Sequence, residues 1–175
     1  AYEIRFCLVG SEMCIRDSRY SLRRIWEPKK QKIIFILLNP STATELRNDP
    51  TVERCERRAR VLGFGAFIVC NIFAWRDTNP EKMKLAIDPI GEHNNRAIVE
   101  GCHWANKLIC AWGTHGSHLN RGDEVLAIIR KIPKTLYHLG LTKHGLPKHP
   151  LYISYKQKPP VSYTHLTLPT TRCGL

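Results

Sequence analysis

The sequence predicts an α/β protein, a three-layer α/β/α sandwich around a mostly parallel central sheet. Two observations carry this prediction. Apolar runs such as Ile33–Leu38 and Ala66–Ile72 show no apolar–polar alternation, which is typical of strands buried on both faces. Segments with the apolar spacing of helices separate these runs, and strands that alternate with helices pair in parallel through crossover connections.

Capping and turn residues set the limits of the expected elements. Glu27–Lys30 forms a turn between the first two strands, Asp49 and Pro50 supply the N-cap and first residue of a helix, and Gly63 ends that helix. The expected strands are 20–26, 32–38, 66–72, 108–112, 135–139 and 151–155, and the expected helices are 50–62, 92–105 and 120–131.

The composition narrows the possible functions. Lysine and arginine total 27 against 15 acidic residues, a net charge of +12. This charge favours a polyanionic partner, DNA or a nucleotide, over the alternative of a generically basic protein. No apolar run approaches the length of a membrane span. The cysteines between residues 19 and 160 form no CxxC pair, so we expect no metal, no cofactor and no disulfides, as suits a reducing cytoplasm.

Both ends of the chain resemble translated adaptors from DNA sequencing libraries. Residues 7–17 (CLVGSEMCIRD) back-translate in frame to a transposon adaptor, and residues 161–170 (VSYTHLTLPT) fit the opposite adaptor on the complementary strand. The alternative is a natural tail at each end. We therefore expect a single native α/β domain over residues 19–160, between adaptor-derived tails at 1–18 and 161–175 that pack poorly.

The loop after the strand 32–38 is the most informative segment of the chain. The apolar run stops at Asn39-Pro40-Ser41-Thr42, and Asp49 then opens the first helix. A buried strand, a small polar loop and a helix N-terminus are how α/β proteins present a ligand-binding loop at the carboxyl end of a sheet. The sequence therefore predicts the functional site at this loop.

Polar residues follow the other expected strands as well. Asn71 ends the run 66–72, His115 follows LICAWG, and His149 lies in LPKHPLY. Because the carboxyl ends of parallel strands meet at one edge of a sheet, we expect Asn39, Asn71, His115 and His149 to line one crevice. Each of them alone is equally explained by a turn or a solvated loop.

Three basic segments have two interpretations each. The loop Trp75–Asp77 either holds a base and a phosphate or packs as an ordinary surface loop. Lys148 suits an anionic ligand beside His149, although a basic loop needs no ligand. The first helix carries a basic side that either contacts phosphates or is simply solvated, formed by Arg54, Arg57, Arg58 and Arg60.

From Arg23 to about Tyr155 the chain resembles a bacterial and phage family of unknown function, family 1643. The motifs that carry this resemblance are LNPSTA, NDPTVERC, NIFAWRDTNP, DPIGEHNN, AWGTHG and TKHGLPKHPLY. They cover nearly all of residues 19–160, but they imply no reaction.

The order of motifs also resembles the uracil-DNA glycosylase superfamily. Leu38–Ser41 is similar to its first motif, and Ile68–Ile72 to the strand whose asparagine contacts the base edge. Leu108–Gly113 is similar to a strand that ends in a small turn, and His149–Leu151 to the HPS motif. The resemblance implies a uracil-DNA-glycosylase-like fold, although fold alone does not imply activity.

The resemblance implies cleavage of an N-glycosidic bond. Asn39 would hold the attacking water and His149 would donate a hydrogen bond to the departing base, so these two are the expected catalytic residues. Asn71 would pair with the base edge. The other expected substrate-binding residues are Pro40, Ser41, Thr42, Asp49, Phe73, Trp75, Arg76, His115 and Lys148.

The sequence departs from the glycosylase pattern at two points. Residues 44–49 contain no aromatic residue to stack on a base, so Phe73 or Trp75 would have to serve, and Leu151 stands where the motif has serine. Uracil in DNA is therefore a poor candidate, and a modified base, a nucleoside or a nucleotide is at least as good. The alternative is a non-catalytic domain that binds nucleic acid or nucleotide on the same scaffold.

Overall fold

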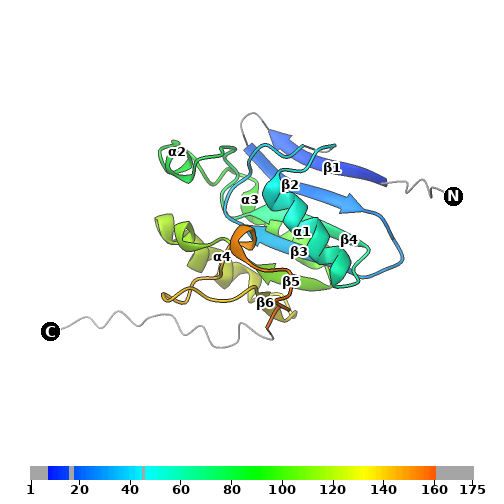
Figure 1. The fold of residues 1–175 in the computed structure, drawn as a ribbon. Coiled ribbons are helices and arrows are strands. Elements are labelled where there is room, and N and C mark those ends of the chain that lie inside the picture. Colours follow the sequence, from blue (N-terminus) through cyan, green and yellow to red (C-terminus); the bar gives the residue numbers. More distant parts are fainter. Residues whose placement is uncertain (1–7, 16–17, 45, 161–175) are drawn as a thin grey trace.

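The computed structural model describes residues 8–15, 18–44 and 46–160, which form a mixed six-stranded sheet with helices (Figure 1). The strands follow the spatial order β1-β2-β4-β3-β5-β6. Their bounds are Leu8–Ile15 (β1), Ser18–Ile25 (β2), Lys32–Leu37 (β3), Ala66–Asn71 (β4), Lys107–Cys110 (β5) and Leu136–His138 (β6).

Four strands of the sheet run parallel. β3 lies at their centre and pairs with β4 on one side and β5 on the other, and β5 pairs with β6. β2 and β1 extend the sheet with antiparallel pairings beyond β4. The predicted mixed α/β organisation with a mostly parallel sheet is therefore confirmed.

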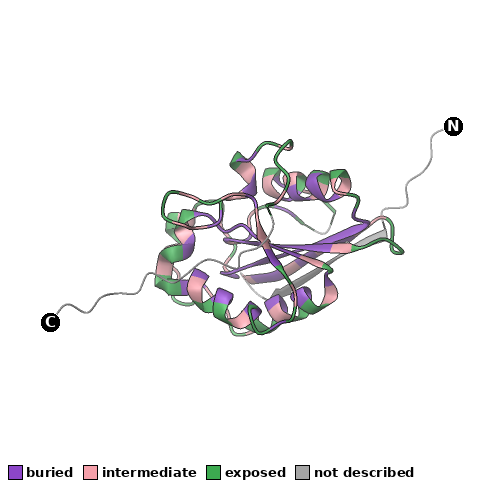
Figure 2. Ribbon diagram, turned by 90° about the horizontal axis from the view of Figure 1, so that it is seen from below, coloured by how far each residue is buried: buried purple, intermediate pink, exposed green. Residues whose placement is uncertain are grey.

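Helices cover both faces of the sheet, because the strands bury both of their faces. Phe35 and Phe67 pack on one face with Cys55 of the first helix. Ile34 and Ile98 belong to a second cluster on the opposite face. In Figure 2 the central strands and the inner sides of the helices are buried, while the outer sides of the helices are exposed. The long helices are α1 (Pro50–Val61) on the first face, and α3 (Asn94–Trp104) and α4 (Arg121–Ile129) on the second.

Three short helices lie in the connections, and the sequence analysis missed all of them. They are α2 (Pro80–Lys84), η1 (Thr114–Asn120) and η2 (Pro150–Tyr152). The predicted strand at 151–155 is wrong. Pro150 has no N–H to give to a β ladder, and the His149 side chain caps the short helix by accepting from the Leu151 N–H.

The segment Leu8–Ile15 was expected to belong to a poorly packed tail, but it forms the outer strand β1. It pairs antiparallel with β2, for example Met13 with Ser21. This backbone is therefore part of the sheet, whereas residues 1–7 and 161–175 lie outside the described residues. The adaptor origin of both ends stays a prediction.

The order of the parallel strands creates a topological switch point between β3 and β5. The chain leaves β3 through α1 to reach β4 on one side, and it leaves β5 through α4 to reach β6 on the other. Because these two connections diverge, a crevice opens beyond the carboxyl ends of β3 and β5. Ligands of open α/β sheets bind in such crevices.

Candidate functional site

A pocket of about 750 Å³ lies at this switch point. Its walls come from the loops that follow β4, β3, β5 and β6, together with the N-terminus of α1. It is large enough for one nucleotide-sized ligand. The polar and aromatic residues of these walls include Asn39, Asp49, Asp77, His115, His149 and Tyr152.

The expected site residues divide into two groups. Those that line the pocket are Asn39, Ser41, Asp49, His115, Lys148 and His149. Those that do not line it are Pro40, Thr42, Asn71, Phe73, Trp75 and Arg76.

Asn39 follows β3 and its amide is held by backbone groups. Nδ2 donates to the carbonyl oxygen of Asp77 at 2.7 Å and to that of Pro40 at 3.2 Å. These two acceptors identify the nitrogen of the amide, so the other atom is the acceptor Oδ1. No described residue donates to Oδ1. The side chain therefore offers the pocket an oriented acceptor for an O–H group.

Asp49 acts as the N-cap of α1, as the sequence predicted. Its Oδ1 accepts from the backbone N–H groups of Thr51 at 2.9 Å and Val52 at 2.8 Å, and Oδ2 accepts from that of Ala43 at 3.3 Å. The residue is only 7 % exposed. Because both oxygens are engaged, Asp49 fixes the loop, and its charge acts on the pocket through space.

His149 is the group whose protonation this pocket changes most. Burial lowers the pKa of the imidazole to about 4, against the opposing effect of the Asp49 carboxylate. Nδ1 accepts from the Leu151 N–H at 3.4 Å, so the proton of the neutral ring lies on Nε2. His149 is thus a neutral hydrogen-bond donor at neutral pH.

Gly113 lets the His149 loop lie against the end of β5. Its φ of +76° is in the left-handed region, and a Cβ at this position would lie 3.4 Å from the Cβ of His149. The Gly113 N–H donates to the Pro147 carbonyl at 2.8 Å, which joins the two loops. Glycine is needed here for its backbone conformation and its close approach to the histidine.

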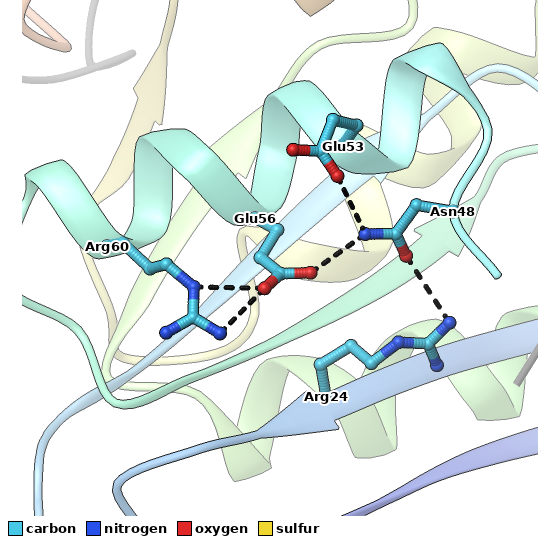
Figure 3. Close-up of polar contacts among 5 residues, drawn as sticks. All are labelled: Arg24, Asn48, Glu53, Glu56 and Arg60. Carbon is cyan, nitrogen blue, oxygen red and sulfur yellow. Dashed lines mark hydrogen bonds and ion pairs between the residues drawn. The ribbon is translucent and has the colours of Figure 1, made fainter. Parts of the chain in front are cut away.

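The loop between β3 and α1 is fixed from outside the pocket (Figure 3). Asn48 donates to Glu53 at 3.1 Å and to Glu56 at 2.8 Å on α1, and Arg24 of β2 donates to Asn48 at 3.4 Å. Arg60 holds Glu56 through two hydrogen bonds of 2.9 and 2.7 Å. Arg24 also donates to the Thr44 carbonyl. The loop that carries Asn39 is therefore tied to both a strand and a helix.

Asn71 was expected at the crevice, but it is buried, 2 % exposed, and does not line the pocket. The reason is topological. The crevice opens between β3 and β5, and β4 lies one strand further out. The loop after β4 still reaches the pocket, because the Asp77 N–H donates to the Pro40 carbonyl at 3.0 Å.

Phe73 and Trp75 do not supply the expected stacking ring. Phe73 is fully buried in the core on the α3 side, and Trp75 packs against the same cluster. The aromatic residues that line the pocket are Trp112 and Tyr152. Trp112 is 1 % exposed and Tyr152 is 82 % exposed, so only Tyr152 offers a free ring face.

Sequence reasoning missed Tyr152 and Asp77 as site residues. Tyr152 lies three positions after His149, and the assignment of 151–155 to a strand concealed it. Asp77 belonged to the loop Trp75–Asp77 with its two interpretations, but it was not among the expected site residues. The signal that could have found them is their position in the connections after β4 and β6, which flank the switch point.

Two arginines of the basic side of α1, Arg54 and Arg58, fit neither of its two interpretations. Arg58 donates to the carbonyls of Ile153, Ser154 and Gln157, and Arg54 donates to that of Ile153. These arginines bind the segment that follows η2, and η2 itself packs beside α1 (Figure 1). They hold the protein's own chain, and they do not line the pocket.

The described part of the chain has neither a cluster of metal ligands nor a membrane-spanning helix. No group of three or more potential metal-ligating side chains lies together among these residues. No helix of this part of the chain has the length and apolar character needed to cross a bilayer.

The fold and the pocket define an α/β protein with a partly polar pocket at the switch point of its sheet. The model of the family described as "Protein of unknown function (DUF1643)" matches residues 19–151, and the chain belongs to that family. No curated protein and no solved structure matches the chain.

Proposed function

We propose that the protein hydrolyses the N-glycosidic bond of a base, a modified base in DNA or the base of a nucleotide, in a pocket like that of the uracil-DNA glycosylases. One observation supports this most. Asn39, with an oriented acceptor, and His149, with a neutral donor, line the same pocket at the switch point. The reaction requires one group of each kind.

The chemistry follows from the charges that the reaction develops. As the bond between the sugar C1′ and the base nitrogen breaks, positive charge grows on the sugar and negative charge on the base. Oδ1 of Asn39 would accept from the attacking water and orient its oxygen toward C1′. Nε2–H of His149 would donate to the base as it takes the bonding electron pair. Water supplies the hydroxyl of the sugar product and the proton of the released base.

Tyr152 would hold the base before cleavage. Its exposed ring lies near the imidazole of His149, with ring centroids 6.3 Å apart. Stacking of a base on an aromatic ring contributes about 1–3 kcal/mol. This residue takes the role for which the sequence analysis had considered Phe73 and Trp75.

Base release, followed by mass spectrometry with the 175-residue protein, tests the proposal. The substrates are single- and double-stranded DNA with uracil, mismatches or modified pyrimidines, and free nucleosides and nucleotides. We expect release by the wild type and a loss of at least about a hundredfold in Asn39→Ala and His149→Ala, the usual scale for removing such groups. Asn106→Ala is the matched control, because Asn106 accepts from the Lys32 N–H at the opposite edge of the sheet.

The second candidate is a binding domain that performs no reaction. Both oxygens of Asp49 accept from backbone N–H groups, Oδ1 in the N-cap and Oδ2 from Ala43, so this carboxylate is not available as a base. Binding of a ligand without release of its base, in wild type and variants alike, would favour this function. Activity that survives both Asn39→Ala and His149→Ala would exclude the catalytic assignment of these residues.

A further inference from the structure

Asp77 lines the pocket, and one of its carboxylate oxygens has no donor among the described residues. Its backbone is fixed on both sides, because its N–H donates to the Pro40 carbonyl at 3.0 Å and its carbonyl accepts from Asn39 at 2.7 Å. Its Oδ1 accepts from the Asn79 N–H at 2.8 Å, while no described residue donates to Oδ2. The pocket therefore contains a negatively charged hydrogen-bond acceptor, held in place beside Asn39.

The charge of the pocket is opposite to what a nucleic-acid strand requires. Among the described residues no arginine lines it, and Lys148 is the one lysine, against Asp49 and Asp77. The net charge of +12 is thus not concentrated at the site. A strand that passed through the pocket would bring a phosphate on both sides of the bound sugar, and a phosphate next to a carboxylate is repelled, whereas a nucleoside has no phosphate and a 5′-mononucleotide has one on a single side.

A carboxylate instead suits the hydroxyl groups of a ribose. Asp and Glu side chains accept hydrogen bonds from ribose hydroxyls in nucleotide-binding α/β proteins, and such charge-assisted bonds are among the strongest that proteins make. We propose that the pocket binds a single ribonucleoside unit, free or as its mononucleotide, with the sugar hydroxyls on Asp77.

The strand order fixes the direction of this ligand. Asp77 follows β4 and Asn39 follows β3, while His149 and Tyr152 follow β6 on the far side of β5. A ribose on Asp77 therefore lies beside Asn39, and its base extends toward His149 and Tyr152. This direction rests on the proposed function, because it puts C1′ next to the residue that holds the water and the base next to the donor.

Equilibrium binding tests the inference independently of turnover. Isothermal titration calorimetry with the 175-residue protein would compare the four common ribonucleosides, their 2′-deoxy forms, their 5′-monophosphates and a twelve-nucleotide single-stranded DNA. We expect at least one ribonucleoside to bind, about tenfold or more tighter than its 2′-deoxy form, and Asp77→Asn to remove that preference. The arms with and without phosphate distinguish a nucleoside from its mononucleotide.

Asp88→Asn is the matched control. Asp88 lies in the same connection between β4 and α3 and its carboxylate accepts from the Gly91 N–H, but it does not line the pocket. We expect this variant to keep the ribose preference. A melting temperature for each protein separates loss of binding from loss of folding, and Asp77→Glu, which keeps the carboxylate, should retain part of the preference.

Three results would overturn the inference: no binding of any ribonucleoside, equal affinity for the 2′-deoxy forms, or an Asp77→Asn protein that still prefers ribose. Base release measured on the same samples separates the two proposals. Ribose-selective binding without release supports the inference and contradicts the reaction. Release from DNA, without nucleoside binding, supports the reaction and contradicts the inference.

Discussion

At the scale of single residues, burial of His149 determines what this side chain can do. A histidine with an ordinary pKa exchanges its proton near neutral pH, and it then offers either a donor or a positive charge. In this pocket the lowered pKa keeps the ring neutral, and the Leu151 N–H occupies Nδ1. The pocket thus presents Nε2–H over the whole physiological range of pH.

The same burial makes stability depend on pH. The unfolded chain takes up a proton on His149 near pH 6.5, while the folded protein takes it up only near pH 4. Stability from this residue is therefore present above pH 6.5 and is lost as the pH falls toward 4, by up to about 3 kcal/mol. Urea denaturation at pH 4.5 and 7 should give a smaller difference for His149→Gln than for wild type.

The exposed His144 provides the control for this prediction. His144→Gln should keep the pH dependence of the wild type. Burial also lowers the pKa of His138, so part of the dependence should remain in every variant. A His149→Gln protein with an unchanged dependence would show that the imidazole is not held neutral by the fold.

At the scale of elements, the N-cap of α1 affects both the stability of the fold and the pKa of His149 in the pocket. Asp49 caps the helix and holds the Ala43 N–H, and its charge raises the pKa of His149 against burial. One side chain therefore anchors the loop that carries Asn39 and adjusts the histidine of the opposite wall.

Two substitutions of Asp49 separate these effects. Asp49→Ala removes the cap and should lower the free energy of unfolding by about 1–2 kcal/mol. Asp49→Asn can still cap the helix, so it should cost less, but it removes the charge and should lower the pKa of His149 further. Denaturation and NMR titration of the His149 ring measure the two quantities. Equal pKa values in wild type and Asp49→Asn would contradict the electrostatic effect.

The central elements were predictable because their signals are local. The apolar runs 32–38 and 66–72 became β3 and β4 to within one residue, and the Asp49–Pro50 cap set the start of α1. The segment 151–155 was not predictable in the same way. Its apolar residues suggest a strand, but Pro150 and the His149 cap turn it into η2, and this change brings Tyr152 to the pocket.

At the scale of the whole molecule, strand order decides which predicted residues meet. The sequence indicated that residues at strand ends gather at one edge, and this placed Asn39, His115 and His149 correctly in one pocket. No local signal in the sequence specifies the order of the strands in the sheet. Asn71 was expected beside them for that reason, but β4 lies outside the switch point.

At this scale Arg58 of α1 also joins two segments that are far apart in the sequence. Arg58 is 2 % exposed and donates to three carbonyls of residues 153–157. Arg58→Leu leaves these acceptors without their charged donor and should destabilise the protein by roughly 2–4 kcal/mol. It should also raise hydrogen exchange in the segment 150–157.

Arg57→Leu is the control for the Arg58 substitution. Arg57 is exposed, and its guanidinium lies over the face of Tyr155, 4.6 Å from the ring centroid. This variant should change stability by less than about 1 kcal/mol. If both variants lose the same stability, the carbonyl contacts are not what holds the segment.

The hydrogen bonds from Arg58 of α1 to the segment after η2 also determine at what stage of protein synthesis the pocket can form. The contact from Arg58 to the Gln157 carbonyl spans 99 residues of chain. During synthesis the Asn39 loop therefore leaves the ribosome long before the wall that carries His149 and Tyr152. A nascent chain that has not yet reached His149 and Tyr152 possesses half of a pocket, and the complete pair of acceptor and donor arises only after these residues have been synthesised.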